Sequence, residues 1–175
     1  MGQMTALIVA TSQRGLGFAA KAASDIPAET FASRPRLASG AAVDCNHPAF
    51  VFGHLSLYPA RVAMLCGLDP APYATPAAYE GLFKAGVECR DDAARTIYPA
   101  KDELVSRFTK NYEGLLAALP SIDDSVLFRE TPDERYRQFF PHVGMAANFM
   151  LTSHVMMHMG QISTWRRCFG LKSVM

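Results

Sequence analysis

Residues 153–167 read SHVMMHMGQISTWRR and place two histidines, His154 and His158, four positions apart. Side chains at positions i and i+4 of an α-helix lie one turn apart on the same face, so two imidazoles can reach one small ion. Apolar residues at helical spacing continue this face, namely Ala147, Met150, Leu151, Ile162 and Trp165. We therefore expect both rings to point into a helical core, where their nitrogens need polar partners.

A third histidine, His54, lies on an earlier apolar segment. Its face carries Phe50, Val51, Leu57, Tyr58 and Leu65. Across a helical core His54 can supply a third nitrogen to the same divalent cation, and imidazole suits zinc, nickel, copper and iron alike. The alternative is that each ring is an ordinary core histidine with hydrogen-bond partners. Three inward histidines on two helices favour the metal site.

Other residues in or near the motif have candidate roles of their own. Gln161 can orient a metal ligand, or it can bind a neighbouring backbone group. Trp165 is expected to pack in the core rather than stack on a substrate. Gly160 is expected to let another helix approach closely. Arg166 and Arg167 can bind an acidic cofactor, or they can interact with the helix dipole.

Two further histidines and several absent motifs narrow the chemistry. His47 and His142 precede predicted helices, so we expect capping or surface roles, with a peripheral ligand role as the minor alternative. A zincin needs HExxH, but Val155 stands where its glutamate would be. No Glu-x-x-His pair of the di-iron bundles occurs in the last two predicted helices. The three-histidine site is thus the main candidate.

The chain is expected to form long helices with irregular connections. Apolar residues recur at helical spacing in residues 4–23, 48–67, 102–119 and 142–169. Pro59 should bend the second of these helices just past His54. Residues 68–100 and 120–141 form two long connections, the first functional or carrying short helical turns, the second with a short helix near residues 133–139. Strand signals are scarce. This pattern predicts one all-α domain over residues 1–175, a four-helix bundle with long crossover connections.

Composition excludes several functional classes. Seventeen Lys and Arg offset sixteen Asp and Glu, for a formal net charge of +1, which argues against a broad nucleic-acid surface. No stretch approaches the roughly 20 apolar residues of a membrane-spanning helix. The cysteines are far apart and form no CxxC pair: Cys45, Cys66, Cys89 and Cys168. We expect free thiols and a cytoplasmic protein that binds neither nucleic acid nor a membrane.

The last motif, HVMMHMGQISTWRR, resembles the H-x-x-x-H-x-G-Q-[IL]-S-x-W-R-R signature of the DinB/YfiT-like metal-binding four-helix bundles. The earlier segment NHPAFVFGHLSLYPARVAML resembles the Gly-His-Leu segment of the same family and places the first ligand at His54. Weaker similarities lie in GLFKAG, YPAKDEL and SRPRL. Together these segments cover most of the chain in the order of the family.

The resemblance implies that His54, His154 and His158 hold one divalent cation and leave a position open for water or substrate. Some members of this family transfer or isomerise small molecules with a low-molecular-weight thiol such as bacillithiol or mycothiol, and many have no established activity. It therefore implies a metal-dependent thiol transferase, or a related hydrolase, that acts on a small electrophile. The alternative is a non-enzymatic metal- or ligand-binding bundle linked to stress. Relatives often pair, so a homodimer is expected.

Overall fold

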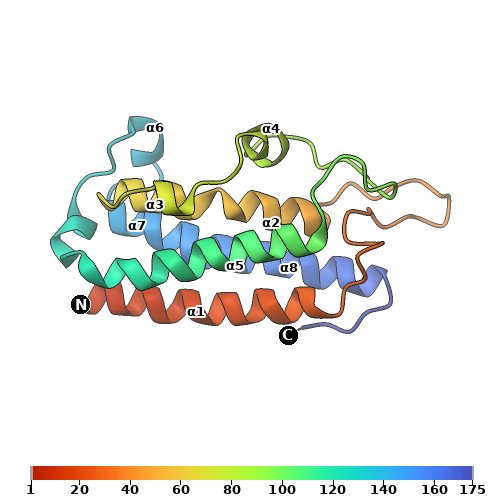
Figure 1. Cartoon of the computed structure of the whole chain (residues 1–175), viewed down its shortest axis with the longest axis horizontal. Coiled ribbons are helices and arrows are strands. Elements are labelled where there is room, and N and C mark those ends of the chain that lie inside the picture. The colour runs from red at the N-terminus through yellow and green to blue at the C-terminus, as the bar shows by residue number, and fades with distance from the viewer. Residues whose placement is uncertain (1, 175) are drawn as a thin grey trace.

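The computed structural model describes residues 2–174, and its regular elements are helices (Figure 1). The α-helices are α1 (Gln3–Ser24), α2 (Pro48–Ser56), α3 (Tyr58–Leu65), α4 (Ala78–Phe83), α5 (Lys101–Ala118), α6 (Glu134–Arg137), α7 (Val143–Asn148) and α8 (His154–Cys168). Short 3-10 turns lie at Ala71–Tyr73, Leu119–Ser121 and Asp124–Phe128. Within residues 2–174, extended pairing is limited to the isolated bridges Arg36–Ala42 and Glu130–His142. The predicted all-α class is confirmed.

The long helices lie side by side around one apolar core. Helix α1 contacts α5 and α8, and α2 contacts the same two helices, so the contacts close a ring. In Figure 1, α1 and α8 run in one direction, whereas α2, α3 and α5 run in the other. The connection after α3 returns along the length of the molecule past α4, but the connection after α5 stays at one end with α6. Of the two long connections, only the first is a crossover.

Helix α1 has a buried face of small side chains, which hydropathy alone does not indicate. Its buried residues are Thr5, Ile8, Ser12, Gly15, Ala19, Ala22 and Ala23. By contrast, Leu7 is 63 % exposed. The hydroxyl of Ser12 donates a hydrogen bond to the Ile8 carbonyl oxygen at 2.7 Å, so its burial leaves no unpaired hydrogen. Small residues at every third or fourth position let this helix lie close to its neighbours.

The second predicted helix is divided at Leu57, as the position of Pro59 suggested. Helix α2 ends at Ser56 and α3 begins at Tyr58. Proline has no N–H to donate and its ring crowds the preceding turn, so a regular helix cannot continue through this point. The Leu57 N–H instead donates to the His54 carbonyl oxygen at 3.2 Å, which is a tighter turn. The division therefore separates His54, near the end of α2, from Tyr58, the first residue of α3.

The last predicted helix contains an irregularity that the sequence does not indicate. Helices α7 and α8 are joined by a π-helical turn, Phe149–Ser153. The Thr152 hydroxyl donates to the Asn148 carbonyl oxygen at 2.6 Å inside this turn. A π-turn inserts one extra residue and rotates everything that follows, and such turns are frequent at functional sites. This one ends immediately before His154.

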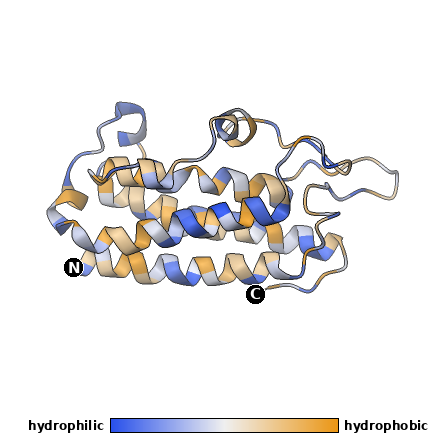
Figure 2. Cartoon of the chain, in the orientation of Figure 1, coloured by the Kyte–Doolittle hydropathy of each residue, from blue (hydrophilic) through white to orange (hydrophobic). Residues whose placement is uncertain are grey.

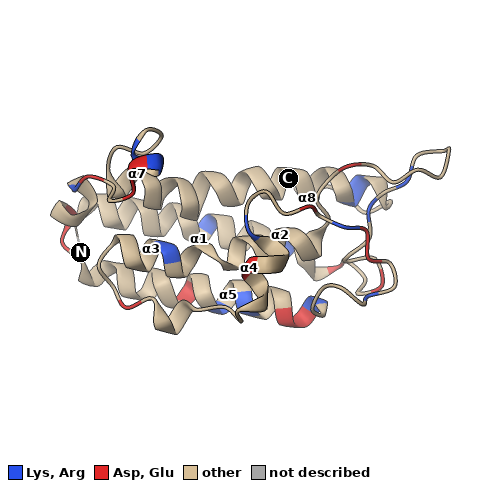
Figure 3. Ribbon diagram, turned by 90° about the horizontal axis from the view of Figure 1, so that it is seen from above, with Lys and Arg blue, Asp and Glu red and all other residues tan. Residues whose placement is uncertain are grey.

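Charged residues of both signs are distributed over the molecule. Hydrophilic residues mark α6 and parts of α5 (Figure 2). Basic and acidic residues are interspersed in the view of Figure 3. Among the described residues, no helix is both long and apolar enough to cross a bilayer. All four cysteines are free thiols.

Candidate metal centre

The three predicted ligands converge in the core. His154 Nε2 lies 3.0 Å from His158 Nε2 and 3.2 Å from His54 Nε2. The candidate ligand atoms of the three residues all lie within 4.8 Å of one another. The rings are 5 to 6 % exposed, so they meet away from bulk solvent. The structure thus brings together the residues predicted on two distant segments, and together they can hold a metal ion.

Two of the rings are oriented by hydrogen bonds at their outer nitrogens. His54 Nδ1 lies 2.7 Å from the Phe83 carbonyl oxygen, and His158 Nδ1 lies 2.8 Å from Gln161 Oε1. Both partners are acceptors, so each Nδ1 carries the hydrogen and each Nε2 keeps a lone pair. These lone pairs point at the same small volume. Several lone pairs facing one another are unfavourable unless a proton or a cation lies between them.

The spacing of the nitrogens agrees with a bound cation. Zinc–nitrogen bonds of about 2.0–2.1 Å in a tetrahedral arrangement place neighbouring nitrogens roughly 3.3–3.4 Å apart. The two Nε2–Nε2 distances of 3.0 and 3.2 Å need only a small expansion to reach that value. Outer hydrogen bonds that fix the tautomer and orientation are usual for metal-ligating histidines. The donor set therefore fits a divalent ion.

Burial keeps the candidate ligands neutral. Desolvation lowers the pKa of His54 to about 4 and that of His154 to about 3. Burial also lowers the pKa of His158, although its hydrogen bond to Gln161 acts in the opposite direction. A neutral imidazole is the form that binds a metal. At pH 7 the site needs to lose no proton from these rings before it accepts a cation.

His154 is held by packing rather than by a polar partner. Its ring stacks on Phe149 at 5.5 Å between centroids and meets the Tyr58 ring edge-on at 4.5 Å. Its Nδ1 is buried and has no hydrogen-bond partner among the described residues. An unpaired buried nitrogen is costly, so the orientation of this ring depends on its aromatic neighbours and on what its Nε2 binds.

Tyr58 is a member of the site that sequence reasoning missed. Its hydroxyl lies 3.2 Å from His54 Nε2 and can donate to that nitrogen, so it shares the atom that a cation would use. The guanidinium of Arg61 lies 5.0 Å from the centre of the Tyr58 ring. The four-residue spacing from His54 to Tyr58 is visible in the sequence, but its apolar neighbours predict only a core position for Tyr58.

Gly53 explains how the loop after α4 reaches the site. A Cβ atom at this position would lie 2.4 Å from the ring of Phe83. Only glycine therefore allows Phe83 to pack against α2, and this packing brings the Phe83 carbonyl oxygen to His54 Nδ1. The Gly-His pair in the sequence thus has a physical reason. The glycine makes room for the residue that orients the adjacent histidine.

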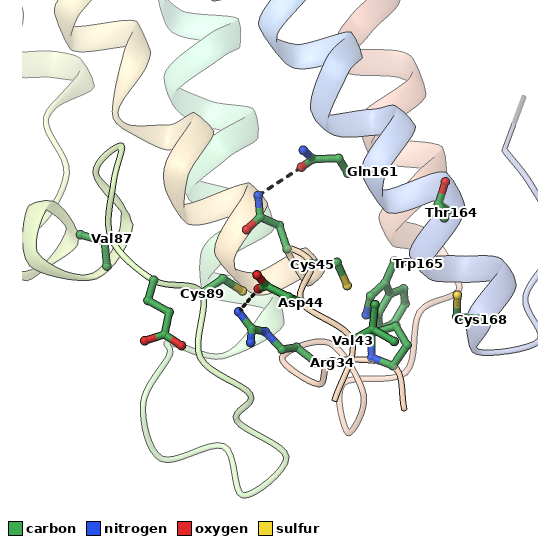
Figure 4. Close-up of a pocket in the computed structure, with 13 residues that line it drawn as sticks. Arg34, Val43, Asp44, Cys45, Val87, Cys89, Gln161, Thr164, Trp165 and Cys168 are labelled. Carbon is green, nitrogen blue, oxygen red and sulfur yellow. Dashed lines mark hydrogen bonds and ion pairs between the residues drawn. The ribbon is translucent and has the colours of Figure 1, made fainter. Parts of the chain in front are cut away.

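The second oriented ring connects the centre to a surface cavity. Asn46 Nδ2 donates to Gln161 Oε1 at 3.2 Å, the bond drawn as a dashed line at Gln161 in Figure 4. The same oxygen accepts from His158 Nδ1. Both amides line a cavity of about 640 Å³ at the ends of α2 and α8. Cys45 and Arg34 lie in the same cavity. Of the two roles predicted for Gln161, the structure shows a hydrogen bond that orients His158, one of the three candidate ligands.

Other residues singled out in the sequence have structural roles. His47 is buried and caps α2, because its Nδ1 accepts from the Phe50 N–H at 3.2 Å. His142 is exposed and makes no side-chain capping bond. Trp165 is buried and donates from Nε1 to the Ser33 carbonyl oxygen at 2.8 Å, as expected of a core residue. Neither His47 nor His142 joins the three-histidine cluster.

The structure corrects one expectation about α8, for Gly160, and excludes one of the two alternatives for Arg166. Gly160 does not mediate a close helix contact, because a Cβ atom there would meet nothing within 4 Å. Arg166 is buried, and its Nη2 donates to Asp25 Oδ2 at 2.9 Å while its Nη1 donates to the Ala22 carbonyl oxygen at 2.7 Å. It therefore ties α8 to the end of α1 and is not available to an acidic cofactor. Arg167 is exposed.

The chain was also compared with known proteins. No family model, curated protein or solved structure matches it. The features that point to a metal site are the convergence of the rings, the hydrogen bonds that orient two of them, and their burial.

Proposed function

We propose that His54, His154 and His158 bind one divalent cation, zinc, nickel or iron, within a DinB/YfiT-like four-helix bundle. The observation that carries the proposal is the convergence of three Nε2 atoms, two of them fixed as acceptors by hydrogen bonds at Nδ1. Three protein nitrogens leave a tetrahedral cation one further ligand position, which is the usual arrangement of a catalytic rather than a structural zinc site.

The proposed activity is transfer of a low-molecular-weight thiol to a small electrophile. A bound cation would supply Lewis acidity, which lowers the pKa of a thiol or a water that binds it. The thiolate sulfur forms a bond to the electrophilic carbon, the bond to the leaving group breaks, and the thiol proton goes to solvent. The buried rings exclude water, Phe83 and Gln161 orient two of them, and Tyr58 places a hydroxyl beside the site.

A turnover experiment tests this activity. Purified protein loaded with zinc is mixed with a haloaromatic electrophile and, in separate reactions, with several low-molecular-weight thiols, and release of halide is followed. We expect a rate above the uncatalysed reaction that His154→Ala abolishes. His142→Ala is the matched control, because it removes an exposed histidine outside the cluster. A background rate with every thiol, or full activity in His154→Ala, would contradict the proposal.

The burial of the site favours a second candidate, a bundle that the cation stabilises without catalysis. Rings that are only 5 to 6 % exposed offer a substrate little access in this conformation. A cation that binds only the folded state at 100 times its Kd stabilises it by about 2.7 kcal/mol. A chelator should then lower Tm sharply while no thiol transfer is found. Loss of activity and of Tm together would instead support the enzyme.

A further inference from the structure

A second cavity lies beside α3 and α7, whereas the cavity in Figure 4 lies at the ends of α2 and α8. It has a volume of about 370 Å³ and lies between α3, the segment at residues 131–136 and the start of the last helical stretch. Its apolar lining comes from Met64, Leu65, Pro132, Ala146 and Met150. Pockets of this size and character accommodate small molecules.

One polar group in the wall of this cavity has no partner. Thr131 is fully buried, and its Oγ1 makes no hydrogen bond within the described residues. The backbone of Thr131 is satisfied, because its N–H donates to the Pro141 carbonyl oxygen at 3.0 Å and its own carbonyl oxygen accepts from Arg137 Nε at 2.9 Å. An unpaired buried hydroxyl carries a free-energy cost to the folded state. Oγ1 has no accessible surface in this structure, so a ligand reaches it only when the side chains around it move, and a hydrogen bond to Oγ1 would then remove this cost.

A positive charge stands at the same cavity. The side chain of Arg61 lines it and is 28 % exposed. Its Nη2 pairs with Glu80 Oε1 at 2.9 Å, but Glu80 is more than half exposed. A pair this exposed to solvent contributes little to stability, so a better placed anion can displace the carboxylate. Asp133 also lines the cavity, and its carboxylate is occupied by Arg135 at 2.8 and 3.2 Å.

The cavity adjoins the three-histidine site through two residues. Arg61 lies over the ring of Tyr58, whose hydroxyl is 3.2 Å from His54 Nε2. Met150 lines the cavity from the π-helical turn, one turn before His154. A molecule whose charged end is held by Arg61 would therefore lie against the side of the site that Tyr58 occupies.

We propose that this cavity binds a small organic monoanion, with its apolar body among the methionines, its charge on Arg61 and a polar atom on Thr131. The inference rests on the proposed function in one respect, because it identifies the substrate class of that site as apolar anions. The cavity itself needs no cation, so binding can be measured separately from turnover.

Calorimetric titration with octanoate tests the inference on the protein as purified, with metal content measured on the same sample. We expect saturable binding at one site. Arg61→Met should weaken binding at least about tenfold, since it removes a charge-assisted contact. Thr131→Val should weaken it about three- to tenfold without lowering Tm, because the free protein loses only an unsatisfied hydroxyl. Glu80→Gln should tighten it about two- to fivefold by freeing Arg61.

Arg34→Met is the matched control, because it removes one arginine from the other cavity. Equal weakening by Arg34→Met would overturn the inference, because octanoate would then not be specific for this cavity. No binding to the folded protein at millimolar octanoate, or binding insensitive to Arg61→Met, would also overturn it. Octanoate binding without thiol transfer would refute only the proposed activity. Thiol transfer without octanoate binding would refute only the assignment of this cavity.

Discussion

Replacing Gln161 by leucine should weaken cation binding while leaving the fold intact. Within residues 2–174, Gln161 Oε1 is the only acceptor for His158 Nδ1, at 2.8 Å. Without it, the imidazole of His158 is free to move its hydrogen to Nε2 and donate to His154 Nε2, which is 3.0 Å away. The Nε2 lone pair of His158 is then protonated and that of His154 accepts the hydrogen bond, so neither is free to bind the cation. The metal-free protein is thereby stabilised relative to the bound form.

The expected loss of cation affinity can be taken from other metal sites, where a hydrogen bond holds the histidine nitrogen that does not bind the metal. Removal of such a hydrogen bond costs about 10- to 100-fold in metal affinity, or roughly 1.4–2.7 kcal/mol. Competition of the metal-free protein with a chromophoric zinc chelator at pH 7 measures it. Gln161→Glu is the control, because a carboxylate accepts the same hydrogen and should keep the affinity at or above that of the wild type. Equal zinc affinity in the wild type and Gln161→Leu would refute this account of the tautomer.

Further predictions concern acid stability, packing and the tyrosine. In metal-free protein, His47 and His54 have a pKa of about 4 when folded against 6.5 as the ordinary value. The unfolded chain therefore binds more protons between these values. The free energy of unfolding from urea titrations should be steady above pH 6.5 and fall towards pH 4, by up to about 1.4 kcal/mol per pH unit for each histidine. Rising stability on acidification would contradict this. Gly53→Ala should lower the free energy of unfolding by about 1–3 kcal/mol and weaken zinc binding, because the Cβ atom of the alanine would meet the Phe83 ring. Gly160→Ala should leave Tm unchanged or raise it in thermal melts, because a Cβ atom at this position meets no other atom within 4 Å and alanine is a better helix former than glycine. Tyr58→Phe should tighten zinc binding about two- to tenfold in the chelator assay, because it removes the hydroxyl that competes for His54 Nε2. Weaker binding would instead make that hydroxyl a ligand.

Much of the helical framework could be predicted from the sequence. Apolar periodicity located the long helices, and Pro59 marked the point where α2 ends and α3 begins. The face containing His154 and His158 was predicted correctly because its apolar neighbours, such as Ile162 and Trp165, are themselves buried. A stripe of large apolar side chains is a reliable guide to the inward face of a helix.

The parts that could not be predicted depend on contacts between distant segments. The Phe83 carbonyl oxygen reaches His54 across 29 residues of sequence, and a backbone oxygen has no residue type that indicates its role. The π-helical turn before His154 is a change of hydrogen-bond register without a composition signal. The buried face of α1 is not evident from the sequence, because it includes Ser12 and Gly15, which an apolar periodicity does not identify as core residues.

The central claim is that one cation lies between three histidines, and anomalous diffraction from crystals grown with zinc tests it most directly. The account predicts a single strong peak at the zinc edge, about 2.0–2.1 Å from the Nε2 atoms of His54, His154 and His158. It would be contradicted by density showing the three rings hydrogen-bonded to one another, with no peak between them, in crystals saturated with zinc.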